Sequence, residues 1–211
     1  DHCTFEDGPR ADDRGPVLFG RQVQHHDGLL DITQQSNWVT VSWNHFHHHD
    51  KTTLVGSSDG QALDDGKLKV TFHHNWYERV KERTPRVRYG EVHVYNNLFE
   101  AGVDGPYPYV YSLGIGHQSR IYSERNAWVT PATVRSAQLL RGLKGNRFVD
   151  NGSTHNGLAV DLLAALRTAH PGVNWVADVG WTPSLFFAMD AVADVPARVR
   201  AGAGAGRGKA D

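Results

Sequence analysis

One short pattern recurs along this chain and constrains its fold more than any other feature. The pattern is an asparagine, any residue, and then an aromatic residue. It occurs at Asn44-His-Phe46, Asn75-Trp-Tyr77, Asn97-Leu-Phe99, Asn126-Ala-Trp128 and Asn146-Arg-Phe148. The asparagines are separated by 31, 22, 29 and 20 residues, and Cys3-Thr-Phe5 fits with cysteine in the asparagine position. Repeats of this length are typical of proteins that stack similar units into a solenoid.

Alternating, β-prone runs precede most of these asparagines and predict half-buried strands. They are VTVSW (39–43), KVTFHH (69–74), EVHVY (91–95) and SRIYSE (119–124). We therefore expect an all-β fold, a right-handed single-stranded parallel β-helix whose coils stack because none can bury its inner face alone. Asparagines at one corner can bond to each other and tolerate the left-handed backbone of tight turns. The alternative is an antiparallel sandwich, but few hairpin signals of the Asn-Gly type are present.

The domain organisation follows from the extent of this pattern. We expect residues 1–190 to form the β-helix domain, as the C-terminal part of a larger domain whose N-terminal piece is missing. Residues 158–169 (LAVDLLAALRTA) predict a helix within a C-terminal helical or irregular segment. Residues 191–211 form a tail that we expect to be low in complexity and disordered from about residue 200.

The segment RVKERTPRVR (79–88) concentrates basic residues in a chain with 22 Lys+Arg against 23 Asp+Glu. Neutrality weighs against a nucleic-acid binder. In a strand, Arg86 and Arg88 share one face and Val87 points inward. Pro85 keeps the residue before it extended, so Arg83 lies in the segment that leads into this strand. Two such charges repel by roughly 3 kcal/mol at an effective dielectric near 20. An anionic ligand would relieve this repulsion, although a solvated surface is also possible.

Two carboxylates, Asp27 and Asp31, lie four residues apart in HHDGLLD. A loop could bring them together on a hard cation such as calcium, which prefers oxygen ligands. Nearby aspartates are more often solvated or capping residues. Lys51 follows Asp50 where a loop leaves the coil, and the simplest interpretation of that pair is a surface ion pair.

Histidines are frequent, in particular at 45, 47, 48 and 49. A zinc site is one interpretation, but the spacing fits no zinc pattern and thiolate ligands are lacking. Consecutive strand residues also point to opposite faces. We expect these histidines to be hydrogen-bonded wall and core residues.

The chain resembles the pectate lyases of polysaccharide lyase family 1, and the Bacillus-type enzymes in particular. The motifs that carry the resemblance are DHCTFEDG, FGRQVQHHDGLLDIT, VTVSWNHFHHHDKTTLVGSSD, DDGKLKVTFHHNWYERVKERTPRVRYGEVHVYNN and VGWTPSL. They cover residues 1 to about 130 and reappear near 179–185, whereas residues 131–178 depart from the family.

The resemblance implies a secreted, monomeric carbon–oxygen lyase that cleaves polygalacturonate, the de-esterified form of pectin, by β-elimination with calcium. It implies that Asp27 and Asp31 bind calcium and that a further calcium ligand lies upstream of Asp1. It also implies that Arg83 is the catalytic base and that Lys51, Arg88 and, in support, Arg86 bind substrate. Neither nucleic acid nor membrane is an expected partner.

An arginine base needs a neutral fraction, which neighbouring cations favour, so we expect an alkaline rate optimum. Two alternatives remain open at this point. One is a lyase for methylated pectin on the same fold, although an ester would not need calcium. The other is an inactive fragment that binds polygalacturonate without turnover.

Overall fold

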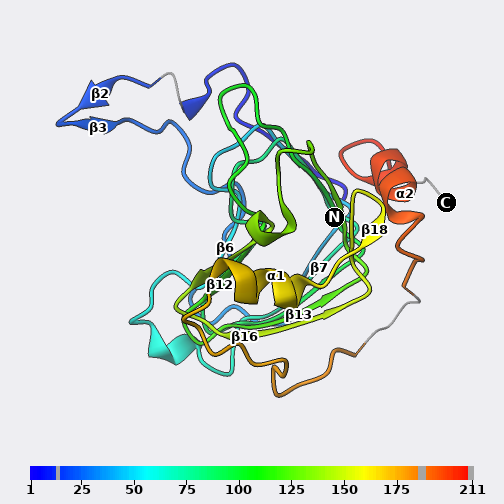
Figure 1. The fold of residues 1–211 in the computed structure, drawn as a ribbon. Coiled ribbons are helices and arrows are strands. Elements are labelled where there is room, and N and C mark those ends of the chain that lie inside the picture. Colours follow the sequence, from blue (N-terminus) through cyan, green and yellow to red (C-terminus); the bar gives the residue numbers. More distant parts are fainter. Residues whose placement is uncertain (13–14, 185–188, 209–211) are drawn as a thin grey trace.

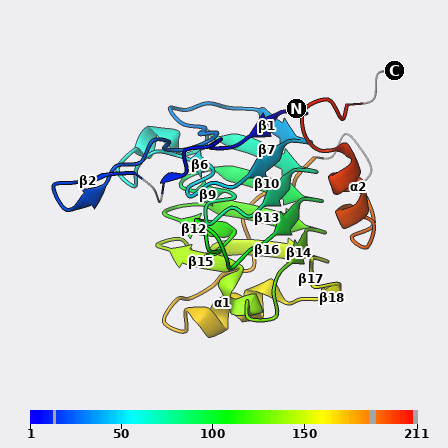
Figure 2. The ribbon, with the colours of Figure 1, turned by 90° about the horizontal axis from the view of Figure 1, so that it is seen from above.

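The chain folds into a parallel β-helix of about four turns, which confirms the predicted fold class. The computed structural model describes residues 1–12, 15–184 and 189–208. Figure 1 looks into the solenoid, and Figure 2, turned by 90°, shows successive coils stacked on one another. Three sheets form its walls, and their strands pair in parallel except for the antiparallel pair at the end of the seven-stranded sheet.

The seven-stranded sheet contains β1 (Thr4–Phe5), β5 (His45–His47), β8 (Trp76–Glu78), β11 (Leu98–Glu100), β14 (Ala127–Val129), β17 (Thr154–His155) and β18 (Leu158–Ala159). The five-stranded sheet contains β4 (Val39–Ser42), β7 (Lys69–His73), β10 (Glu91–Tyr95), β13 (Arg120–Glu124) and β16 (Arg147–Asn151). The four-stranded sheet contains β6 (Leu54–Val55), β9 (Arg86–Val87), β12 (Leu113–Gly116) and β15 (Leu140–Leu143).

The remaining elements are short and lie outside the three parallel walls. They are the antiparallel hairpin of β2 (Val17–Leu18) and β3 (Arg21–Gln22), the 3₁₀ turns η2 (Ala62–Asp64) and η3 (Ser136–Gln138), and the helices α1 (Leu162–Ala169) and α2 (Val195–Gly202). The hairpin projects away from the solenoid (Figure 1).

A ladder of buried asparagines joins the coils at the corner before the seven-stranded sheet. The Oδ1 of Asn75 accepts from the backbone N–H of Asn44 at 3.1 Å, and the Oδ1 of Asn97 accepts from that of Asn75 at 3.0 Å. Asn126 repeats the bond to Asn97 at 2.9 Å. Each amide also donates to the next asparagine, at 3.0–3.1 Å. The ladder satisfies corner N–H groups that strand pairing leaves free, and it fixes the coils in one register.

Two details of this corner differ from the sequence prediction. The left-handed residue is the one before each ladder position: Trp43, His74, Asn96 and Arg125 have φ between 45° and 54°. The ladder also ends at Ser153, whose Oγ accepts from Asn126 N–H at 3.1 Å. Asn146 was wrongly included, because it lies between β15 and β16, at another corner, and is exposed.

The aromatic rings of the repeated pattern stack on one another inside the solenoid. The ring centroids are 4.9 Å apart for Phe5 and Phe46, and 5.1 Å apart for Phe46 and Tyr77. The stack continues through Phe99 to Trp128 at 5.1 and 4.6 Å. These side chains are buried, apart from Phe5 at the end of the stack. Coil stacking therefore builds the core from side chains of equivalent register.

The C-terminal region of the described chain packs against the solenoid. Helix α1, predicted from residues 158–169, buries Leu162 and Leu166 against the core cluster. The tail differs from the disorder expected from about residue 200. Helix α2 buries Val195 and Val199 against Leu98, and Gly204 N–H donates to the Trp43 carbonyl at 2.8 Å. Residues 209–211 lie outside the described part.

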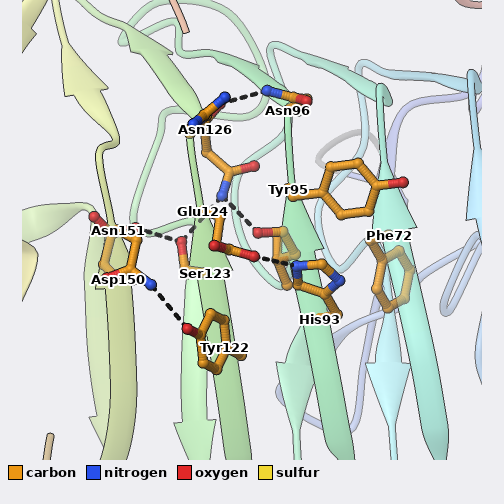
Figure 3. Close-up of polar contacts among 12 residues, drawn as sticks. Phe72, His93, Tyr95, Asn96, Tyr122, Ser123, Glu124, Asn126, Asp150 and Asn151 are labelled. Carbon is orange, nitrogen blue, oxygen red and sulfur yellow. Dashed lines mark hydrogen bonds and ion pairs between the residues drawn. The ribbon is translucent and has the colours of Figure 1, made fainter. Parts of the chain in front are cut away.

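One acidic side chain points into the core of the last coil. Asp150 on β16 occupies the inward row of Phe72 and Val94, and its Oδ1 accepts from the hydroxyls of Ser123 and Ser153 at 2.6 Å each (Figure 3). Burial, only partly opposed by these bonds, raises the pKa of Asp150 from 3.8 to about 6. The carboxylate is therefore held in an unfavourable environment at neutral pH.

We expect Asn97→Ala to lower the free energy of unfolding by about 2–4 kcal/mol, because it leaves buried donors and acceptors on both neighbouring coils unpaired. Asn146→Ala is the matched control and should change stability little, since Asn146 is exposed and lies outside the ladder. Urea unfolding of both variants measures the difference. Equal effects would contradict a special role for the ladder.

We expect Asp150→Asn to stabilise the protein by about 2 kcal/mol at pH 8 and by much less at pH 4. The folded pKa is raised, so the folded state binds more protons between pH 4 and 6. Stability from this group is therefore greatest at low pH and is lost as pH rises through about 6. Unfolding at a series of pH values tests this, and a pH-independent effect of the substitution would contradict it.

Candidate active site

Three loop segments lie side by side where the chain enters the four-stranded sheet. Ile32 N–H donates to the Leu54 carbonyl at 2.8 Å, and Leu29 N–H donates to the Thr52 carbonyl at 2.9 Å. Thr53 N–H then donates to the Arg83 carbonyl at 2.8 Å. These bonds extend the parallel stacking into the loops. They bring the segments that carry Asp27, Lys51 and Arg83 together although these residues are far apart in sequence.

Asp27 and Asp31 form the acidic part of this site. Both residues are exposed, and the Asp31 Oδ1 accepts from Leu54 N–H at 2.8 Å. The pKa of Asp31 is raised, first by partial desolvation and then by repulsion from Asp27, while the Leu54 N–H and the charge of Arg83 oppose the shift. A cation bound between the two carboxylates would oppose the repulsion from Asp27 and offset the lost solvation, and so would favour the charged form of Asp31.

Gly28 provides the space that Asp31 occupies. A Cβ built on Gly28 would lie 2.5 Å from Asp31 Oδ1 and 2.6 Å from Oδ2, so a side chain there would force the Asp31 carboxylate to move. The carboxylate therefore packs against the bare backbone between Asp27 and itself. This cradle and the two neighbouring carboxylates fit a hard, oxygen-liganded cation such as calcium.

A buried network lies behind the Asp27 loop. His49 is fully buried, its Nδ1 lies 2.5 Å from Asp7 Oδ1, and its Nε2 lies 2.8 Å from the Asp27 carbonyl oxygen. The hydroxyl of Tyr107 donates to Asp7 from the other side. This chain of contacts holds the Asp27 backbone from within the protein. His49 is thus one of the hydrogen-bonded core histidines that the sequence predicts.

Asp12 completes the same network, and sequence reasoning missed both it and Asp7. The Oδ1 of Asp12 accepts from the backbone N–H groups of His25 and His26, at 2.7 and 3.0 Å. Asp7, Asp12 and His49 are all buried, and a carboxylate oxygen of each aspartate and a ring nitrogen of His49 lie within 4.8 Å of one another. The signal in the sequence was weak, because two isolated aspartates in a loop are ordinarily surface residues.

Arg83 lies between the acidic and the basic parts of the site. Its backbone is left-handed, with φ of 66°, and its side chain is largely buried. The Nε donates to Glu82 Oε1 at 3.2 Å. Its positive charge opposes the rise in the pKa of Asp31 and adds to the lowering of the pKa of Arg86. Arg83 is therefore central to the arrangement.

Arg86 and Arg88 project from the same face, and Val87 is fully buried between them, as the strand parity predicts. Burial lowers the pKa of Arg86, and repulsion from Arg88 and Arg83 lowers it further. The Nε of Arg86 is buried without a hydrogen-bond partner among residues 1–12, 15–184 and 189–208. The arginines are thus crowded in the structure, as expected from the sequence.

Counter-charges that the sequence did not reveal relieve part of this crowding. Asp59 Oδ1 accepts from Arg88 Nε at 2.8 Å, and Asp59 Oδ2 accepts from Lys144 Nζ at 2.7 Å. These cations lower the pKa of Asp59, the bond from Lys144 being the largest cause. Asp59 therefore fixes the direction of Arg88 while leaving part of its guanidinium available.

Lys51 does not form the ion pair with Asp50 that was the simplest interpretation of the sequence. Its Nζ donates to the side-chain oxygen of Gln24, on the segment that leads to Asp27. Asp50 pairs instead with Lys81 at 2.9 Å. Lys51 therefore lies next to the acidic segment, and its ammonium group is free of any carboxylate partner in the part of the chain that the structure describes.

Comparisons with known proteins agree with this arrangement. The family model described as "Pectate lyase" matches residues 1–207. A pectate lyase of Bacillus subtilis (strain 168) is 43% identical over 208 residues, which cover 98% of this chain and 48% of that protein. Pectate lyase D of Dickeya chrysanthemi is 43% identical over 74% of this chain and 42% of its own length.

A solved structure described as "Pectate lyase bound to hexasaccharide" superposes with a TM-score of 0.91 at 42% identity, over 99% of this chain and 51% of that chain. The parallel β-helix fold and these matches define the class of parallel β-helix polysaccharide lyases. Within that class, the chain belongs to the pectate lyase family. It spans about half the length of the relatives that it matches.

We expect Gly28→Ala to weaken calcium binding about tenfold while leaving the unfolding temperature almost unchanged. The added methyl group meets only the end of the Asp31 side chain, so that carboxylate moves and the backbone does not. Calorimetric titration with calcium measures the effect. Gly172→Ala is the control, because a Cβ there has nothing within 4 Å. Unchanged calcium affinity in Gly28→Ala would contradict the cradle.

Proposed function

We propose that this protein is a calcium-dependent pectate lyase that cleaves polygalacturonate by β-elimination into 4,5-unsaturated oligogalacturonides. The observation that carries the proposal is the placement of Arg83, whose charge acts both on Asp31 and on the crowded Arg86. A polymer with a carboxylate on every sugar can bind cations on the basic side and a bridging metal on the acidic side. Family membership supports the same activity.

In this proposal Asp27 and Asp31 hold calcium and Arg83 acts as the base. Bound calcium would withdraw charge from the uronate carboxylate and so acidify the C5 proton. Lys51 and Arg88 bind the same or an adjacent carboxylate, and Arg86 supports them electrostatically. Arginine suits this task because its planar donors match a carboxylate.

The chemistry is balanced without a further reactant. Arg83 removes the proton from C5, the electron pair forms the C4–C5 double bond, and the C4–oxygen bond breaks. A proton then ends on the leaving oxygen, so no water is consumed. Cations around the uronate stabilise the negative charge that develops during proton removal. The alkaline optimum expected from the sequence stays a prediction of this mechanism.

The surroundings of the enzyme are part of the proposal. Pectic polymers lie outside the cell, so we propose that the protein acts extracellularly, as a monomer. No helix in the described ranges 1–12, 15–184 and 189–208 is long and apolar enough to cross a membrane.

The function is tested by incubating the protein with polygalacturonate and following the ultraviolet absorbance of the unsaturated product, with calcium or with EDTA. Product that forms equally in EDTA would contradict the calcium-dependent mechanism. Higher activity on fully methylated pectin would favour a pectin lyase. Binding of polygalacturonate without product would favour a binding module.

We expect Arg83→Lys to lower the turnover rate at least a hundredfold, because lysine cannot reproduce the position and shape of the proposed base. Arg79→Lys is the control in the same loop, since the exposed Arg79 pairs only with Asp104 at 3.0 Å. Both variants should unfold at the wild-type temperature. An Arg83→Lys rate within a few-fold of wild type would show that another group is the base.

A further inference from the structure

The outer face of the four-stranded sheet carries a row of residues that runs along the stacking direction. The strand register aligns Leu54 with Arg86, Arg86 with Gly114, and Gly114 with Arg141. The row therefore begins beside Asp31, passes through the arginine cluster and ends on β15. Arg141 lies two strands from Arg86, a distance of roughly 10 Å at ordinary strand spacing.

Arg141 is exposed and lies above an aromatic platform. Its guanidinium carbon is 5.7 Å from the centroid of the Tyr111 ring, which is within the range of a cation–π interaction. No carboxylate lies within ion-pair distance of Arg141 in the described segments 1–12, 15–184 and 189–208. The guanidinium is thus oriented by the ring without having its charge neutralised.

Tyr111 connects Arg141 to the proposed active site. The ring is buried, and burial raises the pKa of Tyr111 to about 12, while the positive charges of Arg83, Arg86 and Arg141 oppose the shift. The Tyr111 ring also lies beside Gly114, which pairs with Arg86 on one side and with Arg141 on the other. Tyr111 therefore supports Arg141 in the row that contains Arg86.

Gly114 makes this arrangement possible. A Cβ built on Gly114 would lie 3.1 Å from both Arg86 Cγ and Tyr111 Cε2. A side chain at this position would therefore press on the stem of Arg86 and on the ring that supports Arg141.

The neighbouring cation is engaged differently. Lys144, on the turn after β15, is 74% exposed but pairs with Asp59, which also holds Arg88. Asp59 thus balances Lys144 and Arg88, whereas Arg141 remains unbalanced. The unpaired guanidinium of Arg141, in the same row as Arg86, is suited to bind a carboxylate of a polyanion.

We propose that Arg141, held over Tyr111, binds the carboxylate of a galacturonate residue in the same polymer, beyond the residues bound at Lys51, Arg83 and Arg88. The inference rests on the proposed function and adds a subsite to it. A uronate polymer lying along the stacking direction presents carboxylates at intervals, so one chain can contact Arg88 and, about two sugars further on, Arg141. Neutral or methylated polymers lack the charge that this subsite recognises.

The test compares wild type with Arg141→Ala in calorimetric titrations with trigalacturonate and hexagalacturonate in calcium. All proteins in this test carry Arg83→Lys, so that the oligomers are not cleaved during the titration, and wild type here refers to position 141. Wild type should bind the hexamer more tightly than the trimer. Arg141→Ala should lose about tenfold affinity for the hexamer and almost none for the trimer. Arg141→Lys should fall between them, because it keeps the charge and loses the planar fork.

Arg147→Ala is the matched control. Arg147 is also exposed and follows in the same coil, but it lies on β16 in the five-stranded sheet, where its guanidinium donates to the Asp178 carbonyl at 3.4 Å. The Arg147→Ala variant should bind both oligomers as tightly as wild type does. A methyl-esterified hexamer should show no dependence on Arg141.

The outcomes separate the two proposals. Equal loss for trimer and hexamer, or no loss for either, overturns the subsite while the proposed function stands. If wild type binds no oligogalacturonate at all, both proposals fail together. A loss confined to the charged hexamer supports the subsite.

Discussion

The bonds between equivalent positions of successive coils are the constraint on which this structure depends. Each ladder asparagine satisfies the backbone N–H of the preceding one, so the coils cannot slip without breaking several buried bonds at once. That register places rings over rings in the core. It also determines which loop residues meet, because each loop leaves its coil at the same place as the loop beneath it.

The site is a consequence of this stacking. Thr53 N–H bonds to the Arg83 carbonyl, and Leu29 N–H bonds to the Thr52 carbonyl, so three consecutive layers contribute acids, a lysine and an arginine to one surface. The buried contacts from His49 to Asp7 and to the Asp27 carbonyl then support the outermost layer from inside. The position of the exposed Asp27 loop therefore depends on hydrogen bonds from buried polar groups.

The positive charges of the candidate site are only partly balanced, and by carboxylates in direct contact with them. Glu82 and Asp59 each take one donor from an arginine, yet Arg83, Arg86 and Arg88 remain close enough for repulsion to lower the pKa of Arg86. In the proposed function, a bound polyanion would offset this repulsion. Arg141 extends the positive surface along the axis, because strand register repeats the Arg86 position two coils further on.

The sequence by itself determined the repeat and the strands, because periodic side chains are a local property. Charge density and spacing also drew attention to Arg83, Arg86 and Arg88 and to the pair Asp27 and Asp31, whereas the roles proposed for these residues and for Lys51 came from the family resemblance. It misplaced Asn146, since a three-residue pattern does not reveal which corner a turn occupies. Only the tertiary structure decided that Asp59 pairs with Arg88, that Asp7 and Asp12 support the Asp27 loop, and that Arg141 lies over Tyr111. These pairs join residues from different coils, and their separation in sequence depends on loop lengths that carry no periodic signal.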